Sequence, residues 1–195
     1  EAREEVLRRP SVDAIDLLME EHRLILGACD ALAAFGGSVA AGGGDRAELG
    51  RFVRFIREFA DARHHGKEED ILFTAMVAAG FPRDGGPIAV MLMDHEAGRA
   101  HVGVLAARAE QSADWSAQDR TAIVDAAQGY ADLLRGHIRK EDHILYPMAR
   151  MRLHDEQLDR VNRECAAFEE RQVAAGADAL KELGRELVSR HAAAP

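Results

Sequence analysis

The chain has 195 residues, of which 47% are hydrophobic and 5% aromatic, and it carries a formal net charge of −9. This length suits one domain with an ample core, and the composition favours helices over sheets. The acidic charge argues against nucleic-acid binding, because no basic stripe is available to neutralise phosphates. No uninterrupted apolar run reaches about 18 residues, which argues against a membrane span.

The two cysteines, Cys29 and Cys165, lack the Cys-x-x-Cys spacing of redox and zinc sites. We expect buried free thiols in a reducing compartment, and therefore a cytoplasmic protein. Nine histidines are more than such a chain usually carries. Their positions along the chain are the main clue to function.

A charged lead-in over residues 1–12 precedes the first predicted helix. That helix is expected to begin at a cap formed by Ser11 or Asp13 and to run to about Phe35, where a Gly-Gly pair ends it. Its apolar residues recur at helical spacing, and His22 lies inside this stripe.

The second helix, expected over residues 46–79, carries the densest group of potential ligands. Because an α-helix advances about 100° per residue, His64 and Glu68 fall on its apolar face. His65 lies at the flank of that face, and Glu69 is expected further out toward solvent.

The third helix is expected to begin at Pro87, and its apolar face contains His95. Arg99 lies one turn later and points the same way. An inward arginine needs a carboxylate partner, because an unpaired buried charge is costly. A surface ion pair with Glu96 is the alternative.

The fourth helix, expected over residues 118–147, has the clearest periodicity, and its stripe includes His137 and Glu141. Tyr130 shares this face, either as a core residue or as a hydrogen-bonding group near the site. Residues 151–195 are again helical in pattern and are expected to pack on the bundle as one or two further helices.

Four amphipathic helices joined by short links predict an all-α fold, an antiparallel up-down four-helix bundle. Each helix contributes an inward histidine, and two add a glutamate one turn later. Two shared carboxylates with terminal imidazoles suit two iron ions, whereas a structural zinc would take only four ligands. Ferritin-like sites use Glu-x-x-His, which this chain lacks. One such histidine alone would more often be a satisfied core residue, but six buried groups without a cation would be very unfavourable.

The chain resembles hemerythrin-like proteins of the HHE cation-binding family over roughly residues 13–150. The resemblance rests on Glu21-His22, His64-His65-Gly66-Lys67-Glu68-Glu69-Asp70-Ile71-Leu72-Phe73, Asp94-His95-Glu96-Ala97-Gly98-Arg99, and His137-Ile138-Arg139-Lys140-Glu141 running on to Leu145-Tyr146-Pro147. It implies an oxo- or hydroxo-bridged non-haem di-iron centre with carboxylate bridges. The metal ligands it implies are His22, His64, His65, Glu68, His95, His137 and Glu141, and the residues expected around them are Glu69, Arg99, Tyr130 and Asp142.

Two positions depart from the oxygen-carrying hemerythrins. Those proteins have a second histidine one turn along the third helix, where this chain has Arg99. They also use an aspartate five residues after the fourth-helix histidine. Asp142 has that spacing but lies further round the helix than Glu141. The pattern is closer to iron-sensing and bacterial members of the family, and His65 is expected to supply the seventh ligand.

The first functional expectation is a protein that binds or senses O2, NO or iron at a di-iron centre. The alternatives are a di-iron enzyme that acts on O2 or peroxide, as an oxidase or in a catalase-like reaction, and a bundle whose metal is purely structural. A histidine-rich ligand set favours reversible binding. An open coordination position beside Arg99 favours reactivity.

Overall fold

The computed structural model describes residues 13–174 and 177–192, and within them every regular element is a helix. The predicted all-α class is therefore confirmed. The elements are α1 (Ala14–Ala40), α2 (Arg46–Phe55), η1 (Ile56–His65), η2 (Glu68–Leu72), α3 (Phe73–Ala78), α4 (Gly86–Glu110), α5 (Ala117–Lys140), η3 (Glu141–Leu145), α6 (Tyr146–Arg152), α7 (Asp155–Ala174) and α8 (Ala177–His191), where η denotes a π-helical segment.

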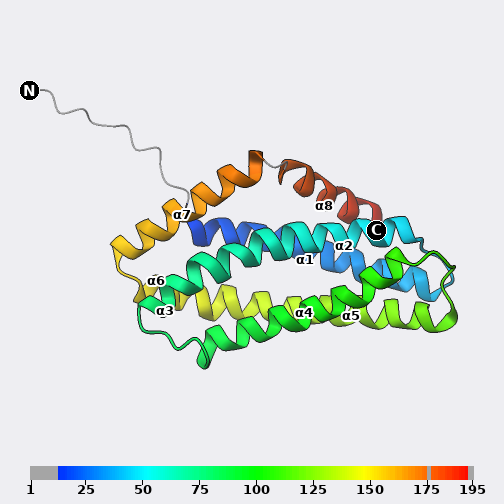
Figure 1. Cartoon of the computed structure of the whole chain (residues 1–195), viewed down its shortest axis with the longest axis horizontal. Coiled ribbons are helices and arrows are strands. Elements are labelled where there is room, and N and C mark those ends of the chain that lie inside the picture. Colours follow the sequence, from blue (N-terminus) through cyan, green and yellow to red (C-terminus); the bar gives the residue numbers. More distant parts are fainter. Residues whose placement is uncertain (1–12, 175–176, 193–195) are drawn as a thin grey trace, which may run out of the picture.

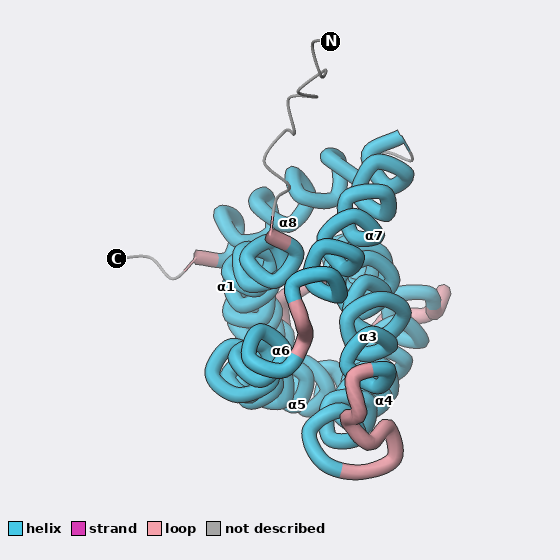
Figure 2. Tube along the Cα trace, turned by 90° about the vertical axis from the view of Figure 1, so that its left-hand side faces the viewer, coloured by secondary structure: helices cyan, strands magenta, loops and turns pink. Residues whose placement is uncertain are grey.

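Four rods form the bundle (Figures 1 and 2). The first rod is α1, and the second is the succession α2, η1, η2 and α3. The third rod is α4, and the fourth is the succession α5, η3 and α6. The two C-terminal helices lie along one side of the bundle, with α8 against α1 and α2, and α7 against α1 and η2.

Side-chain caps determine where three of the rods begin. Asp13 accepts hydrogen bonds from the backbone N–H groups of the first turn of α1, and Asp45 does so for α2. Ser116 and Asp119 form a reciprocal capping box at the start of α5. Each cap satisfies backbone donors that have no partner inside the helix.

The first helix runs to Ala40, past the Gly-Gly pair that was expected to end it. Gly36 is buried against α5, where an added Cβ would lie 3.4 Å from the Cβ of Ala127. A glycine inside a helix costs about 1 kcal/mol relative to alanine, and the close packing of α1 on α5 offsets that cost. The chain turns away at Gly42, whose φ of 91° is in the left-handed region.

Two apolar clusters fill the bundle, one toward each end. The first includes Ile25, Phe59, Val102 and Leu134, and the second includes Leu18, Ile71, Met91 and Leu145. Along every rod the predicted ligands lie between residues of the two clusters. The polar site is therefore enclosed above and below by apolar side chains that exclude water and lower the local dielectric.

Among the described residues, only α1 is long and apolar enough to cross a membrane by length and composition, with a mean hydropathy of 1.4. This is weak evidence for a membrane span, because a core helix of a bundle has the same composition and 44% of the apolar stretch is buried inside this one. Cys29 and Cys165 are both buried free thiols, as expected, and burial raises the pKa of each to about 12.

Candidate metal centre

The site lies where two of the rods change from α-helix to π-helix. The wider π turn occurs at η1 and η2 in the second rod and at η3 in the fourth rod. Such segments are rare and frequently occur at functional sites. In this region His64, His65 and Glu68 are all buried, although α periodicity places His65 only at the flank of the apolar face.

Two groups of potential ligand atoms result. In the first group, which we call the His64 position, the atoms come from His22, His64, Glu68 and Glu141 and lie within 4.8 Å of one another. His22 Nε2 is 3.2 Å from Glu141 Oε2, and His64 Nε2 is 3.8 Å from Glu68 Oε2. All four side chains are buried.

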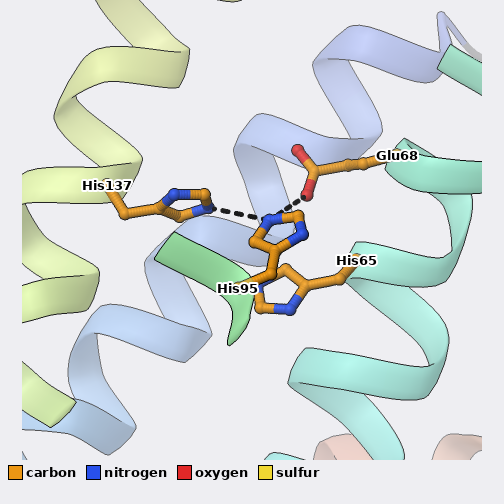
Figure 3. A group of neighbouring side chains, drawn as sticks. All are labelled: His65, Glu68, His95 and His137. Carbon is orange, nitrogen blue, oxygen red and sulfur yellow. Dashed lines mark hydrogen bonds and ion pairs between the residues drawn. The ribbon is translucent and has the colours of Figure 1, made fainter. Parts of the chain in front are cut away.

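The second group, the His95 position, consists of His65, Glu68, His95 and His137, again with ligand atoms within 4.8 Å (Figure 3). Glu68 belongs to both groups, and its Oε2 is 3.5 Å from His95 Nε2. Glu141 Oε2 is also 3.2 Å from His137 Nε2. Glu68 therefore belongs to both groups, and Glu141 of the first group also lies close to a histidine of the second.

Several of these atoms lack any hydrogen-bond partner within the described part of the chain. They are Glu68 Oε2, both carboxylate oxygens of Glu141, and His65 Nε2. Burial lowers the pKa of His65 to about 4, so its ring is neutral and can offer a lone pair. Buried carboxylate oxygens without partners are costly. Three such oxygens and the His65 nitrogen converge here, as the donors of a cation-binding site would, so these residues fit a bound metal.

Four carboxylates orient the inward histidines, and each comes from the preceding rod. Nδ1 of His64 donates to Glu21 at 2.9 Å, and the three equivalent pairs are His95 with Glu69 at 2.7 Å, His137 with Asp94 at 3.3 Å, and His22 with Asp142 at 2.7 Å. We call these four acids the carboxylate ring, because the pairs close a circle around the bundle. A carboxylate can only accept, so each ring places its proton on Nδ1 and directs Nε2 at the centre.

Three members of this carboxylate ring are held in turn by a cation on the same rod as the histidine they orient. Lys67 binds Glu21 at 2.6 Å and Arg99 binds Glu69 at 2.7 Å, while Lys140 binds Asp94. Each cation follows its histidine by three or four residues, which places it one turn further along the same face. The same arrangement of histidine, carboxylate and cation, whose carboxylates and cations form an outer layer around the histidines, therefore occurs three times around the bundle.

The family model of the Hemerythrin HHE cation binding domain matches residues 13–149 of this chain. No curated protein and no solved structure gave a significant match. The chain belongs to the hemerythrin HHE cation-binding family. The predicted family is therefore confirmed, and the domain is a cation-binding one whose buried histidines and glutamates fit a metal site.

Within this hemerythrin domain, Arg99 satisfies both of the alternatives that its sequence position allowed. Its guanidinium contacts Asp61 at 2.8 Å and Glu69 at 2.7 Å, and also Glu96 at 2.5 Å. Asp61 in turn lies 3.3 Å from His65 Nδ1. Arg99 therefore steadies the carboxylates behind two histidines of the His95 position.

The tyrosine that contacts the ligands is Tyr146. Its hydroxyl donates to Glu68 Oε1 at 2.5 Å, and its ring stacks on that of His22 at 5.6 Å. Tyr130, the tyrosine considered from the sequence, lies instead in a neighbouring cavity with its hydroxyl unpartnered among the described residues. Burial raises its pKa well above the usual value, so the hydroxyl keeps its proton.

That cavity has a volume of about 200 Å³ and adjoins the His95 position. Its walls combine apolar side chains, a glycine, a tyrosine, three charged side chains and two candidate ligands. The lining residues are Ile56, Arg57, Asp61, His65, His95, Gly98, Arg99, Val102 and Tyr130. The cavity thus gives a small molecule space directly beside two candidate ligands of the His95 position.

The buried glutamates raise the pKa values of three inward histidines. Burial lowers each of these values, but hydrogen bonds to carboxylates and the charges of Glu68 and Glu141 outweigh it. The pKa is about 9 for His22, about 8 for His95 and about 10 for His137. In the metal-free hemerythrin domain, protons on these rings supply the positive charge that the glutamates need.

Sequence reasoning assigned no role to Glu21, Asp61 or Asp94. Asp61 had a local signal, since it lies four residues before His65 on the same rod. Glu21 and Asp94 each directly precede an inward histidine, but each orients the histidine of the next rod instead. Glu69, expected toward solvent or around the ligands, reaches His95 and lies in the outer layer.

Proposed function

We propose that the protein binds two iron ions and that O2, NO or peroxide is its small-molecule ligand. The observation that carries the proposal is the pair of four-atom groups that share Glu68. Seven donors are too many for one tetrahedral ion, and a mixture of imidazoles with two shared carboxylates suits iron. Bound iron would supply reversible coordination and redox chemistry toward these ligands.

The chain's own residues would divide this task. His22 and His64 would hold one ion, and His65, His95 and His137 the other, with Glu68 and Glu141 shared. The carboxylate ring would keep each Nε2 directed inward and raise its basicity. The apolar clusters would exclude bulk water from the centre.

The cavity beside the His95 position supports a ligand-binding role over a purely structural metal. A metal that only stapled the bundle would need no cavity reaching its ligands. The volume of about 200 Å³ also exceeds that of the apolar cavity of roughly 150 Å³ that holds a benzene molecule. There is room for a peroxide as well as for a diatomic gas, so catalysis on peroxide is the second candidate function.

Anaerobic loading with Fe(II) followed by iron quantification tests the proposal. We expect about two ions per chain, the number that two ligand groups sharing a carboxylate would bind. Glu68→Gln should lower the content, because Glu68 serves both positions, and Asp70→Asn is the matched control because Asp70 is exposed on the same π-helical segment. Iron content clearly below about two per chain, or full loading of Glu68→Gln, would contradict the proposal.

Adding O2, NO and peroxide to separate samples of the loaded protein distinguishes the two candidate functions. A reversible optical change with O2 supports a carrier or sensor. Sustained gas evolution from peroxide supports an enzyme. If neither O2, NO nor peroxide changes the spectrum of the loaded protein, the ligand-binding role is wrong and a structural metal remains.

A further inference from the structure

Helix α7 lies outside the part of the chain that matches the hemerythrin family, yet it packs directly over the ligand-bearing π segment. Its Asn162 side chain accepts a hydrogen bond of 2.8 Å from the backbone N–H of Ala14 at the start of α1. Val161 and Cys165 belong to the apolar cluster below the site. An added Cβ on Gly66, between η1 and η2, would be 3.7 Å from the ring of Phe168. This helix is thus a fixed wall of the bundle beside His64.

The cation that holds Glu21 differs from the other two cations of the outer layer. Arg99 and Lys140 are more than one-third exposed, so water solvates part of their charge. Lys67 is completely buried. A buried ammonium needs more than one carboxylate contact to offset its lost hydration. Its second contact is Glu169 of α7, at 2.6 Å.

Glu169 also binds the other buried cation in this region. Arg63 is 1% exposed, and its guanidinium pairs with the Glu169 carboxylate and lies 3.7 Å from Glu21. Two buried cations therefore face two carboxylates, and one of these carboxylates comes from α7. Without Glu169, both cations would be left to Glu21 alone.

We propose that Glu169 is a positioning residue for the His64 position, acting through Lys67, Glu21 and the Nδ1–H of His64. This proposal rests on the proposed function, because it assigns Glu169 to one of two metal positions. If Glu169 loses its charge, Glu21 is the remaining carboxylate partner of Lys67 and Arg63 and interacts more strongly with both cations. Glu21 then accepts less strongly from His64, whose Nε2 becomes a weaker and less well oriented donor.

The effect should be confined to one position, because the outer groups of the two positions are separate. At the His95 position, Arg99 steadies Asp61 and Glu69 behind His65 and His95. Glu169 contacts none of these groups in the described structure; its partners there are Arg63 and Lys67. The C-terminal extension would therefore tune one ion and leave the other unchanged.

The test is the release of Fe(II) to a ferrous chelator from the loaded full-length protein, under anaerobic conditions. Glu169→Gln keeps the shape of the side chain and removes its charge. We expect one of the two equivalents to be released about tenfold faster and the other at the wild-type rate. Glu169→Asp, which keeps the charge, should restore most of the slow release. Glu170→Gln is the matched control, because Glu170 is the exposed neighbour on the same helix.

A metal-free measurement separates positioning from a general loss of stability. In the metal-free protein, nitrogen NMR signals of the His64 ring should shift in Glu169→Gln, whereas those of His95 should not. Equal acceleration of both equivalents, or unchanged release with unchanged His64 signals, would overturn the proposal. If the wild-type chain binds fewer than two ions, the proposed function fails, and the His64 signals alone still decide whether Glu169 positions that ring.

Discussion

Metal binding should release protons from this protein, because three of the candidate ligands are protonated in its metal-free state. The pKa values of His22, His95 and His137 are about 9, 8 and 10, so near pH 7 each ring is mostly the imidazolium, with a proton on both nitrogens. An imidazole binds a metal only through a deprotonated nitrogen. Filling both positions at pH 7 should therefore displace about three protons.

The same pKa values predict that rising pH lowers the folding stability of the metal-free protein and raises its affinity for metal. The three pKa values lie above that of an unfolded-state histidine, about 6.5. The contribution of the three protonated histidines to folding stability is therefore fully present below about pH 6.5 and is lost as the pH rises through their folded-state pKa values. The metal-free protein should lose stability between pH 7 and pH 10. The overall association constant for the metal should instead rise about tenfold per pH unit for each proton still displaced.

Calorimetric titration with Fe(II) in two buffers of different ionisation enthalpy counts the protons released at pH 7. Denaturant unfolding of the metal-free protein at several pH values gives its stability. His143→Ala removes an exposed imidazole from the same rod as His137 and should leave the count unchanged. Solvent that ionises on the metals can only add to the count. Release of less than about one proton, or metal-free stability that rises with pH, would refute the reasoning.

Two substitutions test the cavity and the tyrosine beside the site. Gly98→Leu should fill the cavity, since Gly98 lines it, and NO should then bind the loaded protein more slowly at unchanged iron content. Gly103→Leu, on the open side of the same helix, is the control and should have no effect. Equal NO binding rates in Gly98→Leu and the wild-type protein would exclude this route. Tyr146→Phe removes the hydroxyl that donates to Glu68; iron affinity measured by chelator competition should fall about tenfold, and an unchanged affinity would mean that the hydrogen bond does not position the carboxylate.

The inward-facing histidines and glutamates were predictable from local spacing. His64 with Glu68, and His137 with Glu141, are each four residues apart, and helical periodicity alone brings such residues to one face. His22 and His95 follow from the apolar stripes that surround them. These inferences need only the rise and twist of a helix, which the sequence pattern reveals directly.

The π-helical segments and the end of α1 were not predictable in this way. Local periodicity assumes a regular α-helix, so it places His65 at the flank of the apolar face, whereas the ring is buried at the end of a π-helical segment. A glycine pair inside α1 is a helix-ending signal by propensity, but packing of Gly36 on α5 overrides it. In both cases the deciding free energy comes from contacts between rods, which local sequence does not contain.

Residue types and their spacing within single helices were enough to predict the fold class, the family and which histidines and glutamates face inward. Which carboxylate orients which histidine depends on the packing of the rods, because every pair in the carboxylate ring joins two different rods, as with Glu21 and His64. The tertiary structure also decided that Tyr146 rather than Tyr130 contacts Glu68, and that Glu169 lies against Lys67 although 102 residues separate them in the chain. Such partners depend on how the rods pack and in what register, and both are properties of the assembled bundle.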